Sequence, residues 1–455
     1  MKDEHEGQGK WWLPEHEDHQ VPGWFTWDSE EAGQLRLVGR LKPIEWEDHE
    51  LPDGTVQRVR RGRAEAMKNR GYPLIHGKAG GKAYTLLDSS SALIRENLFH
   101  PDEASEIIHV DRFLVSAGGW FTNTEDDLAF DGLWADLRHL TAWVGHTGLR
   151  ETLALGLKAD REFASISASK LPKFELVQGT SGSVNLTQWM QLSGDGLHSK
   201  SIEQEWHLQV QKPETRPLNE LVETASDVQD LVSIASGANA DFKELKLEHP
   251  DFISSRSEEE KRTRRTPISY YARWTCPPDK RRVRPHDLFF TFEDFGGAEG
   301  LGRWLKVAEK YRTELGRVMA TRYGRSMYLE DRVMNICAAL DSFDTVRRNT
   351  GIEVHYVTRI KQCTALAGAP FEMIIAQPPD EWAKEVKELR HDIAHHRDRF
   401  RLASPGVGLS MSDQLFWLFV LCLFRLSDTP DSTYESWSKH REIEWLASQA
   451  ASDST

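Results

Sequence analysis

Hydrophobic and polar residues alternate with a period of two along much of the first two thirds of the chain. Residues 35–41 place Leu and Gly between Arg and Val, residues 205–210 alternate Trp, Leu and Val with polar residues, and residues 288–292 repeat the period. This alternation is typical of strands with one buried face. We therefore predict two successive β-rich parts, residues 1–150 and residues 151–314.

Elsewhere the hydrophobic residues recur at steps of three and four, which predicts helices. One helix is expected at 218–231 inside the second β-rich part, and a shorter one at 133–144. After about residue 315 the helical spacing dominates. The seam of Leu and branched residues at 329–343 is suited to packing in a bundle. We expect about four helices in 315–445 and a flexible tail at 446–455, and so an α+β multidomain protein.

The last predicted helix, 412–426, is hydrophobic almost all round. Its run 415–424 contains no charged or strongly polar residue. Ten residues cannot span a bilayer core of about 30 Å, so no membrane insertion is expected. A helix without a polar face has to be covered on every side. In a small bundle a partner subunit is an economical cover, which favours a homodimer.

Composition then limits the class of protein. The chain has 455 residues, 39% of them hydrophobic, which excludes a disordered protein and allows two or three domains. The four cysteines are scattered without a CxxC pair, so they are expected to be reduced core residues. The first residues lack the basic and hydrophobic parts of a signal peptide. A cytoplasmic location is expected.

One basic segment, residues 388–401, stands out in a chain whose formal net charge is -14. It combines four arginines with three histidines. Guanidinium groups hold phosphate oxygens and imidazoles exchange protons near neutral pH, so this segment predicts a phosphate-bearing substrate. On one straight helix Arg390 and His395 would point about 140° apart. Either the helix ends near His395, or two copies of the segment face each other across a dimer.

The spacing of Arg390 and His395 resembles the R-x4-6-H motif of HEPN domains, which are small helical bundles. The resemblance extends to the flanking helices, and these segments together resemble the HEPN region of ApeA-type anti-phage proteins. Segments near the N-terminus resemble the N-terminal domains of the same proteins. Two residues depart from the family pattern, since His391 stands where Asn is usual and Asp341 stands where Glu is usual. The segments that carry the resemblance are 9–14, 21–23, 34–39, 130–143, 329–341, 380–386 and 389–395.

The resemblance implies a metal-independent endoribonuclease that acts as a homodimer in abortive infection, without a cofactor. In such an enzyme a ribose 2′-hydroxyl of the RNA attacks the adjacent phosphorus. His395 would move protons and Arg390 would stabilise the charge of the transition state. Further residues implied are the supporting His391, Asp392 and Asp341 and the RNA-binding Arg397 and Arg399. A separate hypothesis comes from the architecture, because about two thirds of the chain lies outside the helical bundle and carries no catalytic pattern. We therefore expect the N-terminal region to sense infection, with a phage component as the trigger, and to restrain the nuclease.

Two other interpretations of the segment remain open. His391 and His395 are spaced like the ligands of HExxH zinc hydrolases, but an aspartate follows the first histidine in place of the catalytic glutamate. This metal-dependent hydrolase would need a third ligand, for which Glu435 and His440 are the candidates. The other interpretation is a catalytically silent HEPN interaction module, in which neither Arg390 nor His395 matters for function.

Overall fold

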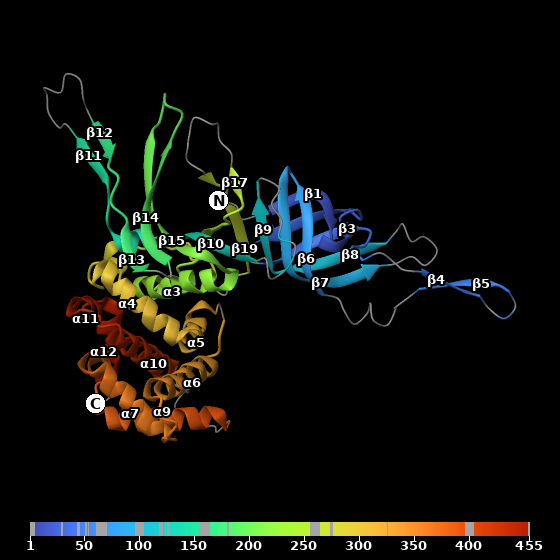
Figure 1. The fold of residues 1–455 in the computed structure, drawn as a ribbon. Coiled ribbons are helices and arrows are strands. Elements are labelled where there is room, and N and C mark those ends of the chain that lie inside the picture. The colour runs from blue at the N-terminus through green and yellow to red at the C-terminus, as the bar shows by residue number, and fades with distance from the viewer. Residues whose placement is uncertain are drawn as a thin grey trace. The chain divides into compact units, whose positions relative to one another are not determined.

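The computed structural model describes most of the chain, and its described residues form two compact units, which are treated separately below (Figure 1). One unit comprises Met1–Trp134, Lys212–Leu221 and Glu244–Trp274, and the other Ala135–Gln211, Val222–Lys243 and Thr275–Thr455. The described residues are 5–28, 31–42, 46–50, 52, 54–60, 71–95, 104–117, 122, 124, 128–153, 164–179, 182–254, 264–273, 276–324, 326–395 and 405–453.

The first unit is built around a closed ring of antiparallel strands. β7 pairs with β6 on one side and β8 on the other, and the order β7-β6-β1-β2-β3-β8 returns to β7. Strand β9 pairs with β7 and β19 pairs with β9. These strands are β1 (His5–Trp12), β2 (Val21–Asp28), β3 (Glu31–Val38), β6 (Gly71–Ala79), β7 (Lys82–Arg95), β8 (Ser105–Val110), β9 (Arg112–Ser116) and β19 (Ile268–Ala272).

Aromatic side chains fill the interior of this ring. In β2 every second residue is buried, as the alternating sequence predicts. Phe25 of β2 lies between Trp11 and Phe113, with ring centroids 5.7 and 5.0 Å away. The register places Gly77 of β6 opposite Trp11, and a Cβ added there would lie 2.1 Å from the indole. Glycine at position 77 is therefore what lets the indole approach the neighbouring strand.

The smaller strand pairs complete the β-rich region. β4 pairs with β5 and β17 with β18. In the second unit β14 and β15 form a long antiparallel hairpin, from Ser183 opposite Gln211 to Ser193 opposite Ser201, and β13 pairs with β14. These elements are β4 (Trp46–Glu50), β5 (Val56–Arg60), β10 (Ala129–Leu137), β11 (Leu149–Leu153), β12 (Ala164–Ala168), β13 (Phe174–Gly179), β14 (Gly182–Ser193), β15 (Ser201–Pro217), β16 (Phe242–Glu248), β17 (Ile253–Ser254) and β18 (Arg264–Arg265).

Helices form the rest of the second unit, and α10 runs through the middle of them (Figure 1). It contacts α4, α6, α7, α8 and α12. The helices are α2 (Leu140–Val144), α3 (Leu218–Ser236), α4 (Gly297–Lys310), α5 (Arg312–Tyr323), α6 (Leu329–Arg348), α7 (Tyr356–Ala367), α8 (Ala369–Ile375), α9 (Pro379–Ala394), α10 (Pro405–Leu426), α11 (Asp431–Ser438) and α12 (Arg441–Asp453).

The all-round hydrophobic helix is covered within the chain. Every side chain from Leu415 to Phe424 is 5% exposed or less. The segment Gly408–Leu426 is long and hydrophobic enough to cross a membrane, yet 72% of its most hydrophobic window is buried inside the protein, as in the core helix of a soluble protein. Neighbouring helices of the same chain therefore cover this helix, so the expectation that a partner subunit covers it is wrong, and the helix gives no support to a dimer.

The predicted α+β class is confirmed: a β-rich N-terminal region precedes C-terminal helices. Other expectations need correction. Residues 129–137 form the strand β10, so the predicted helix at 133–144 is reduced to α2. Leu288, Phe289, Phe290 and Phe292 are buried, but the segment 288–292 forms no strand. The C-terminal helices begin at Gly297, ahead of the expected boundary at 315, which lies inside α5. Residues 446–453, expected to belong to a flexible tail, are part of α12, and Leu446 is buried. The four cysteines are free and buried, as expected.

Candidate functional site

The basic segment begins on α9 and continues past its end. Pro379 stands in the first turn together with two acidic residues, which suits a helix start. Trp382, Val386 and Leu389 form the buried stripe that the sequence predicts. The helix ends at Ala394, and His395 leaves helical geometry with φ -110° and ψ 13°. Of the two arrangements considered for Arg390 and His395, the structure shows the one in which the helix ends near His395.

Arg390 and His395 line the same cavity, which has a volume of ≈ 600 Å³. No described residue of its lining carries a carboxylate. Basic or imidazole side chains come from α9 and from the start of α7, which places several cationic or titratable groups around one space. Such a lining is suited to an anionic ligand. The lining consists of Met334, His355, Tyr356, Val357, Lys387, Arg390, His391, Ala394 and His395.

The guanidinium of Arg390 is positioned by two neighbouring helices. Its Cζ lies 4.3 Å from the centroid of the Tyr356 ring at the start of α7, which is a cation–π contact. Its Nη2 lies 4.0 Å from Oδ2 of Asp341 on α6. Arg359 of α7 holds the same aspartate more closely, with Nε 3.2 Å from Oδ1 and a hydrogen bond of 3.1 Å from Nη1 to the main-chain carbonyl. The structure thus brings Asp341 next to Arg390.

Behind Arg390 the environment is buried and non-ionised. Burial raises the pKa of Tyr356 well above its usual range, and the neighbouring Cys337 raises it further, whereas the charge of Arg390 lowers it. Burial likewise raises the pKa of the Cys337 thiol to about 11. Both groups are therefore neutral near pH 7. Arg390 is then the fixed charge on this wall of the cavity.

Two of the segment's three histidines, His391 and His395, lie one turn apart at the carboxyl end of α9. Their ring centroids are 4.3 Å apart with the planes inclined at 60°. The main-chain amide of His395 donates to the carbonyl of His391 at 3.1 Å. Asp392, between them in sequence, is 6% exposed.

Sequence reasoning missed three polar residues of the cavity, Lys387, His355 and Tyr356. Lys387 precedes Arg390 and His391 by three and four residues, so helical spacing alone could have identified it. His355 and Tyr356 could not have been found this way, because only the packing of α7 against α9 brings them close. Arg397 and Arg399, the predicted RNA-binding residues, lie outside the described residues.

No third ligand for a metal ion lies beside His391 and His395 in the part of the chain that the structure describes. Among the described residues, the only group of three or more His, Cys, Asp or Glu side chains close enough to share an ion is Asp136, Glu205 and His207. Of the two candidates for a third ligand, His440 packs against Phe289, with ring centroids 3.9 Å apart, and Glu435 lies on α11. Neither lines the cavity of Arg390 and His395.

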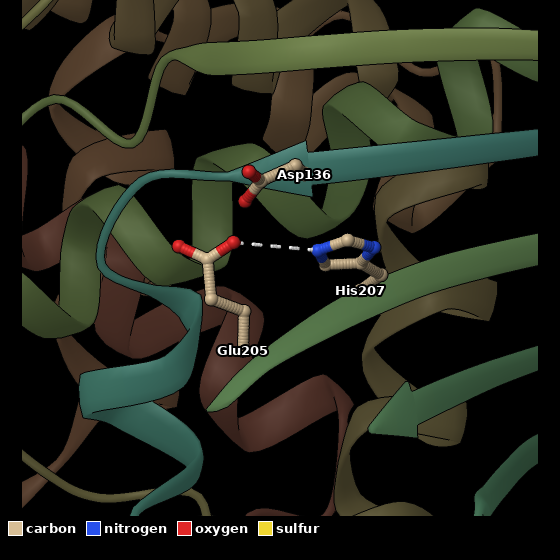
Figure 2. A group of neighbouring side chains, drawn as sticks. All are labelled: Asp136, Glu205 and His207. Carbon is tan, nitrogen blue, oxygen red and sulfur yellow. Dashed lines mark ion pairs between the residues drawn. The ribbon is translucent and has the colours of Figure 1, made fainter. Parts of the chain in front are cut away.

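The group of Asp136, Glu205 and His207 lies on β10 and β15 (Figure 2). Lys243 already supplies a cation there, with Nζ 2.8 Å from Oδ2 of Asp136 and 2.5 Å from Oε1 of Glu205. His207 lies 3.6 Å from Glu205 and, with Lys243, lowers the pKa of Glu205 to about 2. The ammonium takes the place that a metal ion would need, so the group is an internal ion-pair network.

By its fold the chain is an α+β protein, in which a β-rich N-terminal region is followed by C-terminal helices. The model of the family ApeA N-terminal domain 1 matches residues 6–304 of the 455, and the chain belongs to this family. Membership indicates an anti-phage defence protein. No curated protein matches the chain, and no solved structure does.

Proposed function

We propose that the chain is a metal-independent endoribonuclease of the HEPN class that acts in anti-phage defence by abortive infection. The observation that carries the proposal is the placement of both motif residues, Arg390 and His395, on one cavity whose described lining has no carboxylate. A phosphodiester is the anion that such a cavity would meet in RNA. The described residues that line it offer two fixed cations and three imidazoles, from Lys387, Arg390, His355, His391 and His395.

The chemistry needs two proton transfers and a stabilised phosphorane. A base removes the proton of the ribose 2′-hydroxyl, whose oxygen bonds to the adjacent phosphorus. The bond from phosphorus to the 5′-oxygen then breaks, and that oxygen takes up a proton. His395 moves these protons, and Arg390 binds the extra negative charge. His391, whose ring lies 4.3 Å from His395, sets its orientation and protonation. The products are a 2′,3′-cyclic phosphate and a 5′-hydroxyl.

Regulation is the second part of the proposal. The family region at residues 6–304 senses infection, through a phage component, and restrains a nuclease that would otherwise harm its own cell. The active form is a homodimer in the cytoplasm, formed through the helical region. The restraint cannot be tested with a fragment that starts at residue 315, the predicted start of the helical region. Such a fragment would cut α5 and would lack α3 and α4. Those helices pack together: Trp304 donates to the carbonyl of Asp227 at 2.8 Å.

The first test is cleavage of total cellular RNA by the purified full chain in excess chelator. Wild type is compared with Arg390→Ala and His395→Ala. The matched controls are Lys384→Ala, an exposed residue of α9 outside the cavity, and His286→Ala, whose side chain is 70% exposed. We expect chelator-resistant cleavage that falls by about two to three orders of magnitude in both motif variants and is unchanged in the controls. RNA with 2′-O-methyl groups at the cleavage site should remain intact.

Other outcomes identify the alternatives. Cleavage that chelator abolishes would point to the metal-dependent hydrolase. If the purified chain is silent, the same variants are tested during phage infection of cells that express them. Protection that survives both Arg390→Ala and His395→Ala would establish an interaction module and contradict a nuclease.

A further inference from the structure

A second cavity, of ≈ 490 Å³, lies within the second unit and has no part in the site of Arg390 and His395. Its walls come from the carboxyl end of α3, from residues 279–289, and from α5, α6, α10 and α12. The volume lies in the usual range for small-molecule sites. Its lining combines aromatic side chains with arginines and carboxylates, which distinguishes it from an ordinary packing defect in a hydrophobic core.

Aromatic rings form one part of the lining. Phe289 and Trp417 pack edge to face, with centroids 4.8 Å apart, and both are buried. Trp445 of α12 also lines the cavity but is 51% exposed. A tryptophan that keeps half its surface in water beside a cavity offers a flat face on which a planar ring can stack. This half of the cavity is suited to a heterocyclic ring.

Two arginines, Arg322 and Arg332, line another part of the cavity. The guanidinium of Arg322 stacks 3.9 Å above the Phe416 ring, and its Nη2 donates to Asp413 at 2.9 Å. Burial lowers the pKa of Arg322; the carboxylate of Asp413 opposes this shift, and the positive charge of Arg332 adds to it. The Nε of Arg332 is buried and has no hydrogen-bond partner among the described residues. Asp413 already pairs with Arg322, so the unused donor on this wall is the buried Nε of Arg332, which is available to an anionic ligand.

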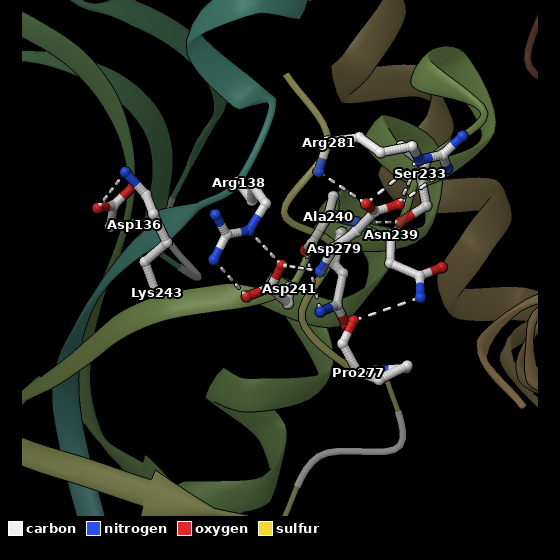
Figure 3. Close-up of polar contacts among 12 residues, drawn as sticks. Asp136, Arg138, Ser233, Asn239, Ala240, Asp241, Lys243, Pro277, Asp279 and Arg281 are labelled. Atoms are coloured by element: carbon white, nitrogen blue, oxygen red, sulfur yellow. Dashed lines mark hydrogen bonds and ion pairs between the residues drawn. The ribbon is translucent and has the colours of Figure 1, made fainter. Parts of the chain in front are cut away.

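The third arginine of the cavity, Arg281, stands at the end of a chain of hydrogen bonds that begins at Arg138 (Figure 3). Arg138 donates to Asp241 at 2.6 Å, and Asp241 accepts from the main-chain amide of Asp279 at 3.2 Å. Asp279 in turn accepts from Nη2 of Arg281 at 2.8 Å, and the same Nη2 donates to the carbonyl of Gly237 at 3.0 Å. Hydrogen bonds within the protein thus occupy part of the Arg281 guanidinium, whose side chain is 66% exposed.

We propose that this cavity binds a mononucleotide. The phosphate lies between Arg322 and Arg332, the base stacks on Trp445, and the exposed carboxylate of Glu442 at the rim accepts from the ribose hydroxyls. A free phosphate would leave the aromatic wall unused, and a nucleoside would leave the Nε of Arg332 without an acceptor. The proposal does not depend on the ribonuclease activity, because binding is measured without RNA.

The test is binding of nucleotides to the full chain by isothermal titration calorimetry and thermal melting. Each nucleoside monophosphate is added at about 1 mM, beside the matching nucleoside and inorganic phosphate as separate arms. We expect at least one nucleotide to raise the melting temperature by about 3 °C or more. Arg332→Gln and Trp445→Ala should each weaken its binding about tenfold or more. The matched controls, Arg317→Gln on the exposed face of α5 and Trp24→Ala, should bind as wild type does.

Any of four results would overturn the proposal. The first is that wild type binds none of the nucleotides at about 1 mM, a concentration at which a ligand with a dissociation constant tenfold lower would raise the melting temperature. The second is that a nucleotide binds but both cavity variants keep its affinity. The third is that inorganic phosphate binds as tightly as the nucleotide, which would remove the role of the base. The fourth is that the nucleoside binds as tightly as the nucleotide, which would remove the role of the arginines. Should Arg332→Gln fail to fold, Arg332→Lys replaces it, since lysine keeps the charge and loses the planar fork.

Discussion

Nη2 of Arg390 lies 4.0 Å from Oδ2 of Asp341, beyond hydrogen-bond distance, whereas Arg359 approaches the same carboxylate to 3.2 Å. Asp341 therefore attracts Arg390 without occupying its donors. Because both side chains are about one third exposed, the pair adds little to stability. What it supplies is direction: the guanidinium stays over Tyr356 with its donors available to a phosphate.

This relationship predicts a graded response at Asp341. In Asp341→Asn the guanidinium keeps its stacking on Tyr356 but loses the attraction that orients it. RNA cleavage should fall by about tenfold, less than the two to three orders of magnitude expected for Arg390→Ala. Asp341→Glu keeps the charge and should retain most of the activity. Initial rates on one RNA, with circular dichroism to verify folding, are the measurement. Equal losses in Asp341→Asn and Arg390→Ala would show that the carboxylate acts directly.

Tyr356 gives a second prediction, since its ring and its hydroxyl have separate roles. Tyr356→Phe keeps the face over which Arg390 lies, so its cleavage rate should stay within about threefold of wild type. Tyr356→Leu removes the cation–π contact, worth about 1 kcal/mol, and should lose about fivefold or more. Burial keeps the pKa of the hydroxyl well above its usual range, so Tyr356→Phe should leave the pH profile of cleavage unchanged up to pH 9. A profile that shifts in Tyr356→Phe would assign the hydroxyl a part in proton transfer.

The shared cavity predicts how mixed oligomers behave. Arg390 and His395 of a single chain line it together. When Arg390→Ala and His395→Ala chains are co-expressed with different tags and purified as the mixed species, no chain carries both side chains. Cleavage should then stay as low as in either variant alone. If each site instead took its arginine from one chain and its histidine from the other, the mixed species would regain one complete pair. Recovery well above both parents would establish that composite arrangement.

Much of the fold follows from the periodicity of the sequence, and the failures have a common physical reason. Leu133 and Leu137 are four residues apart, which places them on one face of a helix but also on one face of a strand. The structure resolves the ambiguity for the strand, with Leu133, Ala135 and Leu137 all buried. At 288–292 the alternation is only apparent, because Phe289 between the expected inward positions is buried as well. An irregular segment packed on all sides produces the same spacing of hydrophobic residues.

The sequence itself indicated the candidate site along α9, and beyond α9 the family resemblance added only Asp341 of α6. Arg390 and His395 are five residues apart, so the sequence alone identifies them as a pair. Tyr356 and Asp341 reach Arg390 only because α6 and α7 pack against α9. No pattern in the sequence predicted the second cavity. Arg332 and Trp445 are separated by more than a hundred residues, and neither belongs to a local pattern that would indicate a ligand.

A buried acid–phenol pair in the second unit gives the last prediction. Tyr323 donates from its hydroxyl to Oδ1 of Asp230 at 2.5 Å, and Ser233 lies 3.2 Å from the same hydroxyl. Burial raises the pKa of Asp230 to about 7, and the nearby Asp227 raises it further, although the bond from Tyr323 lowers it. In the unfolded chain the same carboxyl has its ordinary pKa near 3.9.

Because the folded state holds the proton of Asp230 more tightly than the unfolded state, its contribution to the free energy of unfolding is complete below pH 4. It is lost as the pH rises towards 7, by roughly 4 kcal/mol at the upper limit. Asp230→Asn accepts the Tyr323 hydroxyl with its amide oxygen but does not titrate. The melting temperature of wild type relative to Asp230→Asn should therefore fall steadily between pH 5 and pH 8. The control is Asp195→Asn, on the exposed β14–β15 hairpin, where the pKa shift has the opposite direction. Hydrogen bonds to the carboxylate lower the pKa of Asp195, so its contribution to the free energy of unfolding is already complete at pH 5. The melting temperature of wild type relative to Asp195→Asn should therefore stay constant from pH 5 to pH 8. A melting difference for Asp230→Asn that is equally flat would mean that Asp230 is ionised in the folded protein throughout, with Tyr323 as its donor.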